Sequence, residues 1–192
     1  MLRSLVGSEM CIRDRFSVWR NKDKDPRGSD SKAGQTNYDD LYADILLWLK
    51  EKWVDYVAPQ LYLEIGHDKI DYAKMLEWWS KNSYGRNLYI GLGIYRSGSN
   101  AAWRNPNELP NQIKLLRKYP NVQGGIYFSS KSFNDNPNGW SDSLRNNYYR
   151  VQVATPQMDW LPRNPNQKNS TSFLPNDLHN QANQGENVKG QK

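Results

Sequence analysis

Three apolar runs recur along this chain at a constant interval, and that interval restricts the possible folds more than any other feature. The runs begin at Val54, Leu88 and Val122, which lie 34 residues apart (54 to 88 and 88 to 122). This interval is the length of one strand followed by one helix. The segments between the runs carry apolar residues at helical spacings of three and four, so strands and helices alternate. We therefore predict a parallel α/β sheet with crossover helices.

The predicted elements form four strand-and-helix units. The sequence patterns place the end of a first strand at 16–20 and further strands at 53–63, 88–95 and 122–129. Helices are expected over 37–52, 68–82, 107–118 and 141–148, with Asn37 and Ser141 as caps of the first and last. Four such units make about half of a (β/α)8 barrel, which needs roughly 250 residues for eight units. We predict half of such a TIM barrel, with an independent four-unit α/β sheet as the alternative.

Composition divides the chain into three parts. Residues 1–15 follow neither period, and the run from Ser4 to Arg15 looks like a translated adapter or vector sequence, with a native disordered arm as the alternative. Residues 16–160 hold the periodic units. Residues 161–192 are rich in Asn, Gln, Ser, Pro and Lys, and this composition buries too little apolar surface to offset the entropy of ordering. We predict a disordered tail or linker there.

Charge and residue counts exclude several classes of function. The net charge is +6, but Lys and Arg are scattered and no motif that reads RNA or DNA accompanies them. No apolar run reaches the roughly 20 residues that a membrane-spanning helix needs. One cysteine, Cys11, and two histidines, His67 and His179, are too few for a site based on these ligands. We expect no metal, no other cofactor, no nucleic-acid partner and no transmembrane segment, and the oligomeric state is left open.

Polar and aromatic side chains follow the ends of the predicted strands. The carboxyl ends of parallel strands meet on one face, and ligands bind at that face in such folds. Glu64 is the acidic residue that stands immediately beyond a strand end. A carboxylate there suits general acid or base catalysis on a glycosidic bond, a reaction that uses a pair of carboxylates. We predict Glu64 as catalytic, with a solvated loop glutamate as the alternative.

The aromatic content favours sugar as the ligand. The chain has 8 Trp and 12 Tyr, and sugar rings present apolar faces that can stack on indole and phenol rings. Gly91 and Gly93 in the third predicted strand would let a neighbouring group approach the backbone closely. For His67 an ordinary polar surface role is the alternative. The predicted substrate-binding residues are Trp19, Arg20, Gln60, Tyr62, His67, Tyr95, Phe128 and Ser129.

Six segments of the chain resemble the glycosyl-hydrolase-like family 10 domain, which is distinct from the family 10 xylanases. The most specific is the Asp-Tyr-x-x-Pro-Gln-x-Tyr run at 55–62; the others lie at 16–21, 38–44, 78–80, 89–91 and 125–129. The resemblance extends from Phe16 to about Trp160. It implies a (β/α)8 barrel of which this chain supplies units five to eight. It also implies a bacterial cell-envelope, periplasmic or secreted protein that cleaves glycan strands, including peptidoglycan stripped of its peptides.

The chain departs from the family pattern at three places. It lacks the Asp-rich motif of the fourth strand, a leading candidate for a catalytic carboxylate. Leu63 stands where the family usually has Trp, and Leu92 where it usually has Gln. The resemblance therefore implies a fragment of a glycoside hydrolase that is inactive by itself. The alternatives are a non-catalytic carbohydrate-binding module that uses the aromatic strand ends, and a cationic surface protein with no role in glycan binding.

Overall fold

A computed structural model gives the fold of residues 17–151, 156 and 158–160. The chain divides into two units, residues 1–148 and residues 149–192. The described strands and helices all belong to the first unit. The predicted leader, residues 1–15, and the predicted tail, residues 161–192, lie outside the described residues.

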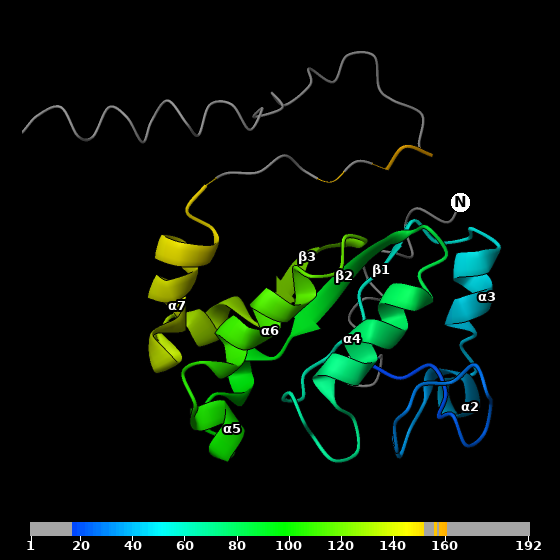
Figure 1. The fold of residues 1–192 in the computed structure, drawn as a ribbon, viewed down its shortest axis with the longest axis horizontal. Helices are drawn as coiled ribbons and strands as arrows, with labels where there is room; N and C mark the ends of the chain where they lie inside the picture. Colours follow the sequence, from blue (N-terminus) through cyan, green and yellow to red (C-terminus); the bar gives the residue numbers. More distant parts are fainter. Residues whose placement is uncertain (1–16, 152–155, 157, 161–192) are drawn as a thin grey trace, which may run out of the picture. The chain divides into compact units, whose positions relative to one another are not determined.

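Three short parallel strands form one sheet. They are β1 (Tyr56–Val57), β2 (Asn87–Leu92) and β3 (Val122–Tyr127), in the order β1-β2-β3 (Figure 1). The pairs between β2 and β3 run from Leu88 with Val122 to Leu92 with Tyr127, with one register shift after Leu88. An isolated bridge between Gln60 and Gly91 extends the contact of the first two strands beyond the end of β1. The predicted mixed α/β class with a parallel sheet is confirmed.

Short helices connect the strands. Helix α4 (Tyr72–Lys81) follows β1, α5 (Ala101–Arg104) and α6 (Glu108–Leu116) follow β2, and α7 (Trp140–Ser143) follows β3. Two helices precede the sheet, α2 (Asn37–Leu41) and α3 (Ile45–Lys50). The other described elements are short helical turns: η2 (Ile94–Arg96), η3 (Ser130–Phe133), η4 (Pro137–Gly139) and η5 (Leu144–Tyr148). Helix α4 packs on β2 and on α6, and α6 also packs on β3 (Figure 1).

The core forms between the sheet and these helices because both carry apolar residues at matching periods. In β2 every second residue, Leu88, Ile90 and Leu92, is fully buried, as expected for one face of a strand. In α4 the buried residues recur at the predicted helical spacing: Tyr72, Met75, Leu76 and Trp79. Burying a side chain of this size stabilises the fold by about 1.5–3 kcal/mol. Truncating Ile90 to Ala should therefore destabilise the sheet by about 2–5 kcal/mol.

The predicted first strand is not a strand in the described residues. Val18 and Trp19 are buried, but their carbonyl oxygens accept hydrogen bonds from the backbone amides of Asn37 and Tyr38, at 2.9 and 3.0 Å. Both carbonyl groups are thus used by the start of α2 and not by a neighbouring strand. Phe16, the first residue of the predicted strand, lies outside the described residues.

The predicted strands and helices are longer than the observed ones. The strand expected at 53–63 is reduced to β1, and Pro59, which has no amide hydrogen to donate to a ladder, stands shortly after it. The helix expected at 37–52 is divided at Tyr42, whose φ of 53° is left-handed and ends α2. Thr36, and not Asn37, caps α2, since its side chain accepts from the amide of Asp39. Ser141 lies inside α7 and does not cap it.

Candidate functional site

An aromatic ring follows each of the three strands, and the three rings contact one another. Tyr62 comes after β1, Tyr95 lies in η2 just after β2, and Phe128 directly follows β3. The ring centroids of Tyr62 and Tyr95 are 5.7 Å apart, and each lies 5.8 Å from that of Phe128. Tyr62 and Phe128 are stacked, with 22° between their planes, and Tyr95 meets both rings edge-on. We call these three residues the aromatic platform.

The three rings of the platform pack against one another and remain partly exposed to solvent. Tyr95 is 48% exposed and Phe128 is 43% exposed, while Tyr62 is half-buried. Aromatic pairs at these distances stabilise one another by about 0.5–1.5 kcal/mol beyond the area they bury. The rings therefore hold a defined arrangement and still present apolar surface. Such a surface can accept the apolar face of a flat or ring-shaped ligand.

Gly91 and Gly93 of the second strand end make room for the platform. A Cβ atom at Gly93 would lie 2.9 Å from Cβ and 3.1 Å from Cα of Tyr62. A Cβ atom at Gly91 would lie 3.0 Å from Cα of Gln60 and 3.1 Å from a ring carbon of Tyr62. These distances explain the predicted close approach to the two glycines: the approaching groups are the chain's own Gln60 and Tyr62.

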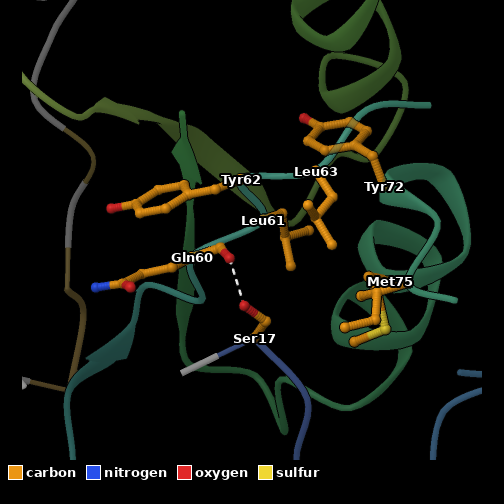
Figure 2. Close-up of a pocket in the computed structure, with 8 residues that line it drawn as sticks. Ser17, Gln60, Leu61, Tyr62, Leu63, Tyr72 and Met75 are labelled. Atoms are coloured by element: carbon orange, nitrogen blue, oxygen red, sulfur yellow. Dashed lines mark hydrogen bonds between the residues drawn. The ribbon is translucent and has the colours of Figure 1, made fainter. Parts of the chain in front are cut away.

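Side chains alternate along the segment that carries Tyr62. Figure 2 shows Gln60 and Tyr62 pointing to one side, while Leu61 and Leu63 point to the other, toward Met75. The backbone carbonyl of Gln60 accepts a hydrogen bond of 2.5 Å from the Ser17 hydroxyl. A small pocket lies here, lined by Ser17, Gln60, Leu61, Tyr62, Leu63, Ile70, Tyr72 and Met75. Its volume of about 10 Å³ has room for one water molecule at most, so it is too small for a sugar.

The carboxylate of Glu64, the predicted catalytic residue, is held by two donors. Asn100 Nδ2 donates to Oε1 at 2.9 Å, and the indole Nε1 of Trp103 donates to Oε2 at 3.0 Å. The Asn100 amide is oriented by its second role, because its Oδ1 caps α5 by accepting from the Trp103 backbone amide at 3.0 Å. Glu64 thus joins the loop after β1 to α5. Its catalytic role stays a prediction.

The predicted residue His67 contacts its own turn. Its Nδ1 accepts hydrogen bonds from the backbone amides of Lys69 and Ile70, both at 3.2 Å. Nδ1 also lies 3.3 Å from Oδ1 of Asp68. A ring nitrogen that accepts from two amides has no hydrogen to donate to a carboxylate, so the backbone bonds hold the ring. His67 thus lies in the turn that leads into α4, and its binding role stays a prediction.

Trp19 does not fit the predicted stacking on sugar, because it is fully buried. Its ring stacks on Trp78 with centroids 6.2 Å apart and meets Tyr38 edge-on at 5.5 Å. Its Nε1 donates to Asp44 at 3.1 Å. The chain itself therefore covers the faces of this ring, and the structure does not bring Trp19 into the platform.

Arg20, predicted to bind substrate with Trp19, is held by two carboxylates. Its guanidinium lies 2.8 Å from Asp39 and 3.4 Å from Asp25, and 4.7 Å from the ring centroid of Tyr38. The hydrogen bond that Arg20 donates to Asp39 raises the pKa of Arg20, and the same bond lowers the pKa of Asp39. This arrangement is an internal ion-pair network that orders the loop before α2.

Two predicted residues lie at the strand ends beside the platform. Gln60 places its side chain on the same side as Tyr62 (Figure 2). Ser129 follows Phe128 directly and is half-buried at the start of η3. Both positions are compatible with contact to a ligand that covers the rings, and their binding roles stay predictions.

Sequence reasoning missed two residues that organise this region. Asn100 caps α5, and the spacing of an Asn three residues before Trp103 is a capping signal that could have been recognised. Glu108 is buried, and its Oε1 accepts from the backbone amide of Ile65 at 2.9 Å. No local pattern could have revealed this contact, because its partners lie 43 residues apart.

Two other features are absent from the described residues. Among them, no group of three or more His, Cys, Asp or Glu side chains is arranged to hold a metal ion. No helix in the same part of the chain has the length and apolar character needed to cross a membrane. The aromatic platform is the candidate site in this part of the chain.

Residues 16–107 match the family described as Glycosyl hydrolase-like 10. Glycosyl hydrolase YngK of Bacillus subtilis (strain 168) is 44% identical over 150 residues, which make up 76% of this chain and 29% of that protein. Glycosyl hydrolase DigH of Escherichia coli (strain K12) is 32% identical over 126 residues, 61% of this chain and 28% of that protein. The chain spans less than a third of the length of these curated relatives. The predicted family is confirmed, and over residues 16–107 this chain belongs to the glycosyl hydrolase-like 10 family.

Proposed function

We propose that this chain is part of a glycoside hydrolase and that the aromatic platform is where it contacts the glycan. One observation carries the proposal: Tyr62, Tyr95 and Phe128 come from three successive strand ends and form one half-exposed cluster. Ligands bind at the carboxyl ends of strands in parallel α/β folds. The names of both relatives, glycosyl hydrolase, support the same class of substrate.

The proposed architecture is an arc of a (β/α)8 barrel. Its support is the consecutive parallel order β1-β2-β3 and the packing of α4 and α6 on the strands. The burial of β3 also supports it, because no residue of this edge strand is fully buried and Ile126 is 39% exposed. An edge of this kind can pair with a further strand. In a complete barrel the platform would lie at the mouth.

The proposed substrates are polysaccharide glycan strands, with the glycan of peptidoglycan as the leading example. Aromatic rings contact the apolar faces of sugar rings, and the Gln60 amide beside Tyr62 can exchange hydrogen bonds with hydroxyl groups (Figure 2). Such substrates lie in the cell envelope or outside the cell. We accordingly propose that the parent protein acts in the envelope, in the periplasm or as a secreted protein.

Calorimetric titration of the 192-residue chain tests the glycan contact. The ligands are peptidoglycan glycan strands freed of peptides and, separately, chitin oligosaccharides. We expect binding that weakens about two- to tenfold in Phe128→Ala, since a ring contact contributes about 0.5–1.5 kcal/mol. Tyr42→Ala is the matched control, because Tyr42 is an aromatic residue that is 91% exposed at the end of α2. A folded chain that binds neither glycan would contradict the proposal.

A non-catalytic carbohydrate-binding module is the second candidate. It is favoured by the two hydrogen bonds to Glu64, because both oxygens of this carboxylate are used within the chain. A chimera of YngK in which residues 16–160 replace the matching segment separates the two. Release of reducing ends from peptide-free glycan strands by the chimera supports the hydrolase. Glycan binding without such release, beside an active parent YngK, supports the module.

A further inference from the structure

Three consecutive residues just beyond Tyr62 are tied to the chain that follows β2. The backbone carbonyl of Leu63 accepts from Gln112 at 3.3 Å, and the backbone amide of Ile65 donates to Glu108 at 2.9 Å. Between them, the carboxylate of Glu64 accepts hydrogen bonds from Asn100, the cap of α5, and from Trp103 in α5. We call these four hydrogen bonds the 63–65 clamp. Its partners on the other side are Asn100, Trp103, Glu108 and Gln112.

The clamp joins half-buried residues, which are 63–65 and Asn100, to buried ones. Trp103 and Gln112 are fully buried, and Glu108 is 7% exposed. Glu108 Oε1 also accepts from Gln112 Nε2 at 2.9 Å, so these two residues of the clamp are hydrogen-bonded to each other. Hydrogen bonds in such surroundings are hard to replace, because a partner left behind stays buried without a donor or acceptor. The clamp should therefore hold one geometry.

The same residues reach the loop after the third strand. Asn138 in η4 donates to the backbone carbonyl of Trp103 at 3.0 Å. The Trp103 ring meets Trp140 edge-on, with centroids 6.1 Å apart. Trp103 thus connects the loops that follow β1, β2 and β3. These are the three segments that carry Tyr62, Tyr95 and Phe128.

We propose that Glu64 is a positioning residue that holds the aromatic platform in its observed arrangement. Tyr62 lies two residues before Glu64, and Tyr95 lies in the segment between β2 and the capping residue Asn100. The two hydrogen bonds of Glu64 join these segments directly. Tyr62 has little freedom at its other side, because its Cα and Cβ lie against Gly93. The effect on glycan binding rests on the proposed function, whereas the effect on ring geometry does not.

Nuclear magnetic resonance of the isotope-labelled 192-residue chain tests this role. Two quantities are measured: nuclear Overhauser contacts among the platform rings, and hydrogen exchange of the Trp103 indole N–H. In Glu64→Ala we expect the contacts of the Tyr62 ring to weaken and the Trp103 exchange to become at least about tenfold faster, because the acceptor is lost. Glu77→Ala is the matched control, since Glu77 pairs with Lys81 on the exposed side of α4. It should change neither quantity.

The conservative variant Glu64→Gln keeps the size of the side chain and one acceptor oxygen. We expect ring contacts between those of the wild type and those of Glu64→Ala. This variant also provides the same readout if Glu64→Ala does not fold, which circular dichroism would show. A role limited to general stability would lower the unfolding temperature and leave the ring contacts of the folded protein unchanged.

Affinity for peptide-free peptidoglycan glycan strands is measured on the same variants. We expect Glu64→Ala to bind about tenfold more weakly than the wild type, a difference of about 1.4 kcal/mol. Loss of ring contacts in a chain whose wild type binds no glycan would support the positioning role and contradict the proposed function. Ring contacts and Trp103 exchange that are unchanged in both Glu64 variants would overturn the positioning role.

Discussion

Two aromatic clusters of this protein each include a ring at a predicted strand end, yet they differ in what they can bind. In the aromatic platform the rings of Tyr95 and Phe128 are 48% and 43% exposed. In the second cluster, formed by Trp19, Tyr38 and Trp78, the central ring of Trp19 is fully buried. The guanidinium of Arg27 lies 5.1 Å from the centroid of that ring and helps to cover it. One cluster is therefore a surface, and the other is part of the core.

The segment after Arg20 differs in length from the segments after β2 and β3. A loop of about 16 residues follows Arg20 before α2 begins, and it folds back on itself. Asn21 Nδ2 donates to the carbonyl of Ala33 at 2.9 Å, and the amide of Lys22 donates to the carbonyl of Ser29 at 2.9 Å. The chain after β2 and β3 turns into η2 and η3 at once. Tyr95 and Phe128 thus stay exposed where a short turn follows the strand, whereas Trp19 is covered where a long loop follows.

The largest effect that separates the two clusters should be on stability. Trp19→Ala should lower the free energy of unfolding by about 3–5 kcal/mol, since it removes a fully buried ring. Phe128→Ala, which removes a half-exposed ring, should lower it by no more than about 1.5 kcal/mol. Chemical denaturation of both variants provides the measurement. Equal losses of unfolding free energy in the two variants would contradict the difference in burial between the two rings.

The next effect concerns the support beneath the platform. Gly93→Ala places a Cβ atom 2.9 Å from Tyr62 Cβ, so the backbone must shift, at a cost of about 1–3 kcal/mol. Glycan affinity should fall with it, because Tyr62 moves. Gly34→Ala is the control, since a Cβ atom there has no neighbour within 4 Å. Thermal unfolding measures the stability and titration with glycan strands measures the affinity. A Gly93→Ala protein with the same stability and affinity as Gly34→Ala would contradict the close contact between Gly93 and Tyr62.

A smaller effect should follow from removing one platform ring. Tyr95→Ala should weaken glycan binding about two- to tenfold, because one ring contact contributes about 0.5–1.5 kcal/mol to the binding free energy. Its unfolding temperature should change little because the side chain is half exposed. Tyr38→Ala is a matched control from the second cluster, with a ring that is 38% exposed. If Tyr38→Ala weakens binding and Tyr95→Ala does not, the assignment of the two clusters is reversed.

The smallest effect concerns the ion pair between Arg20 and Asp39, next to the second cluster. Arg20 lowers the pKa of Asp39 in the folded protein, mainly through its hydrogen bond. The stabilisation is therefore present above the ordinary pKa of Asp, about 4, and is lost as the pH falls through the lower folded value. The stability difference between wild type and Arg20→Ala should be constant near neutral pH and shrink below about pH 4. Denaturation series at several pH values would show this, and a difference that grows in acid would contradict it.

The sequence predicted the arrangement of strands better than the fate of individual side chains. The 34-residue interval and the helical spacing between the apolar runs identified a parallel sheet, because both reflect local geometry. Strand and helix ends were missed at Pro59 and Tyr42, where one residue ends an apolar pattern. The two clusters could not be told apart, since burial of Trp19 depends on Trp78, a partner 59 positions further along the chain (19 to 78). The partners of Glu64 lie 36 and 39 residues away and were invisible for the same reason.

The most direct test of the aromatic platform as the glycan contact is a resonance titration of the 192-residue chain with soluble, peptide-free peptidoglycan glycan strands. We expect shifts in the ring signals of Tyr62, Tyr95 and Phe128, while the indole signal of Trp19 stays in place. Shifts confined to Trp19 and its neighbours, or a folded chain with no shifts at saturating glycan, would contradict it.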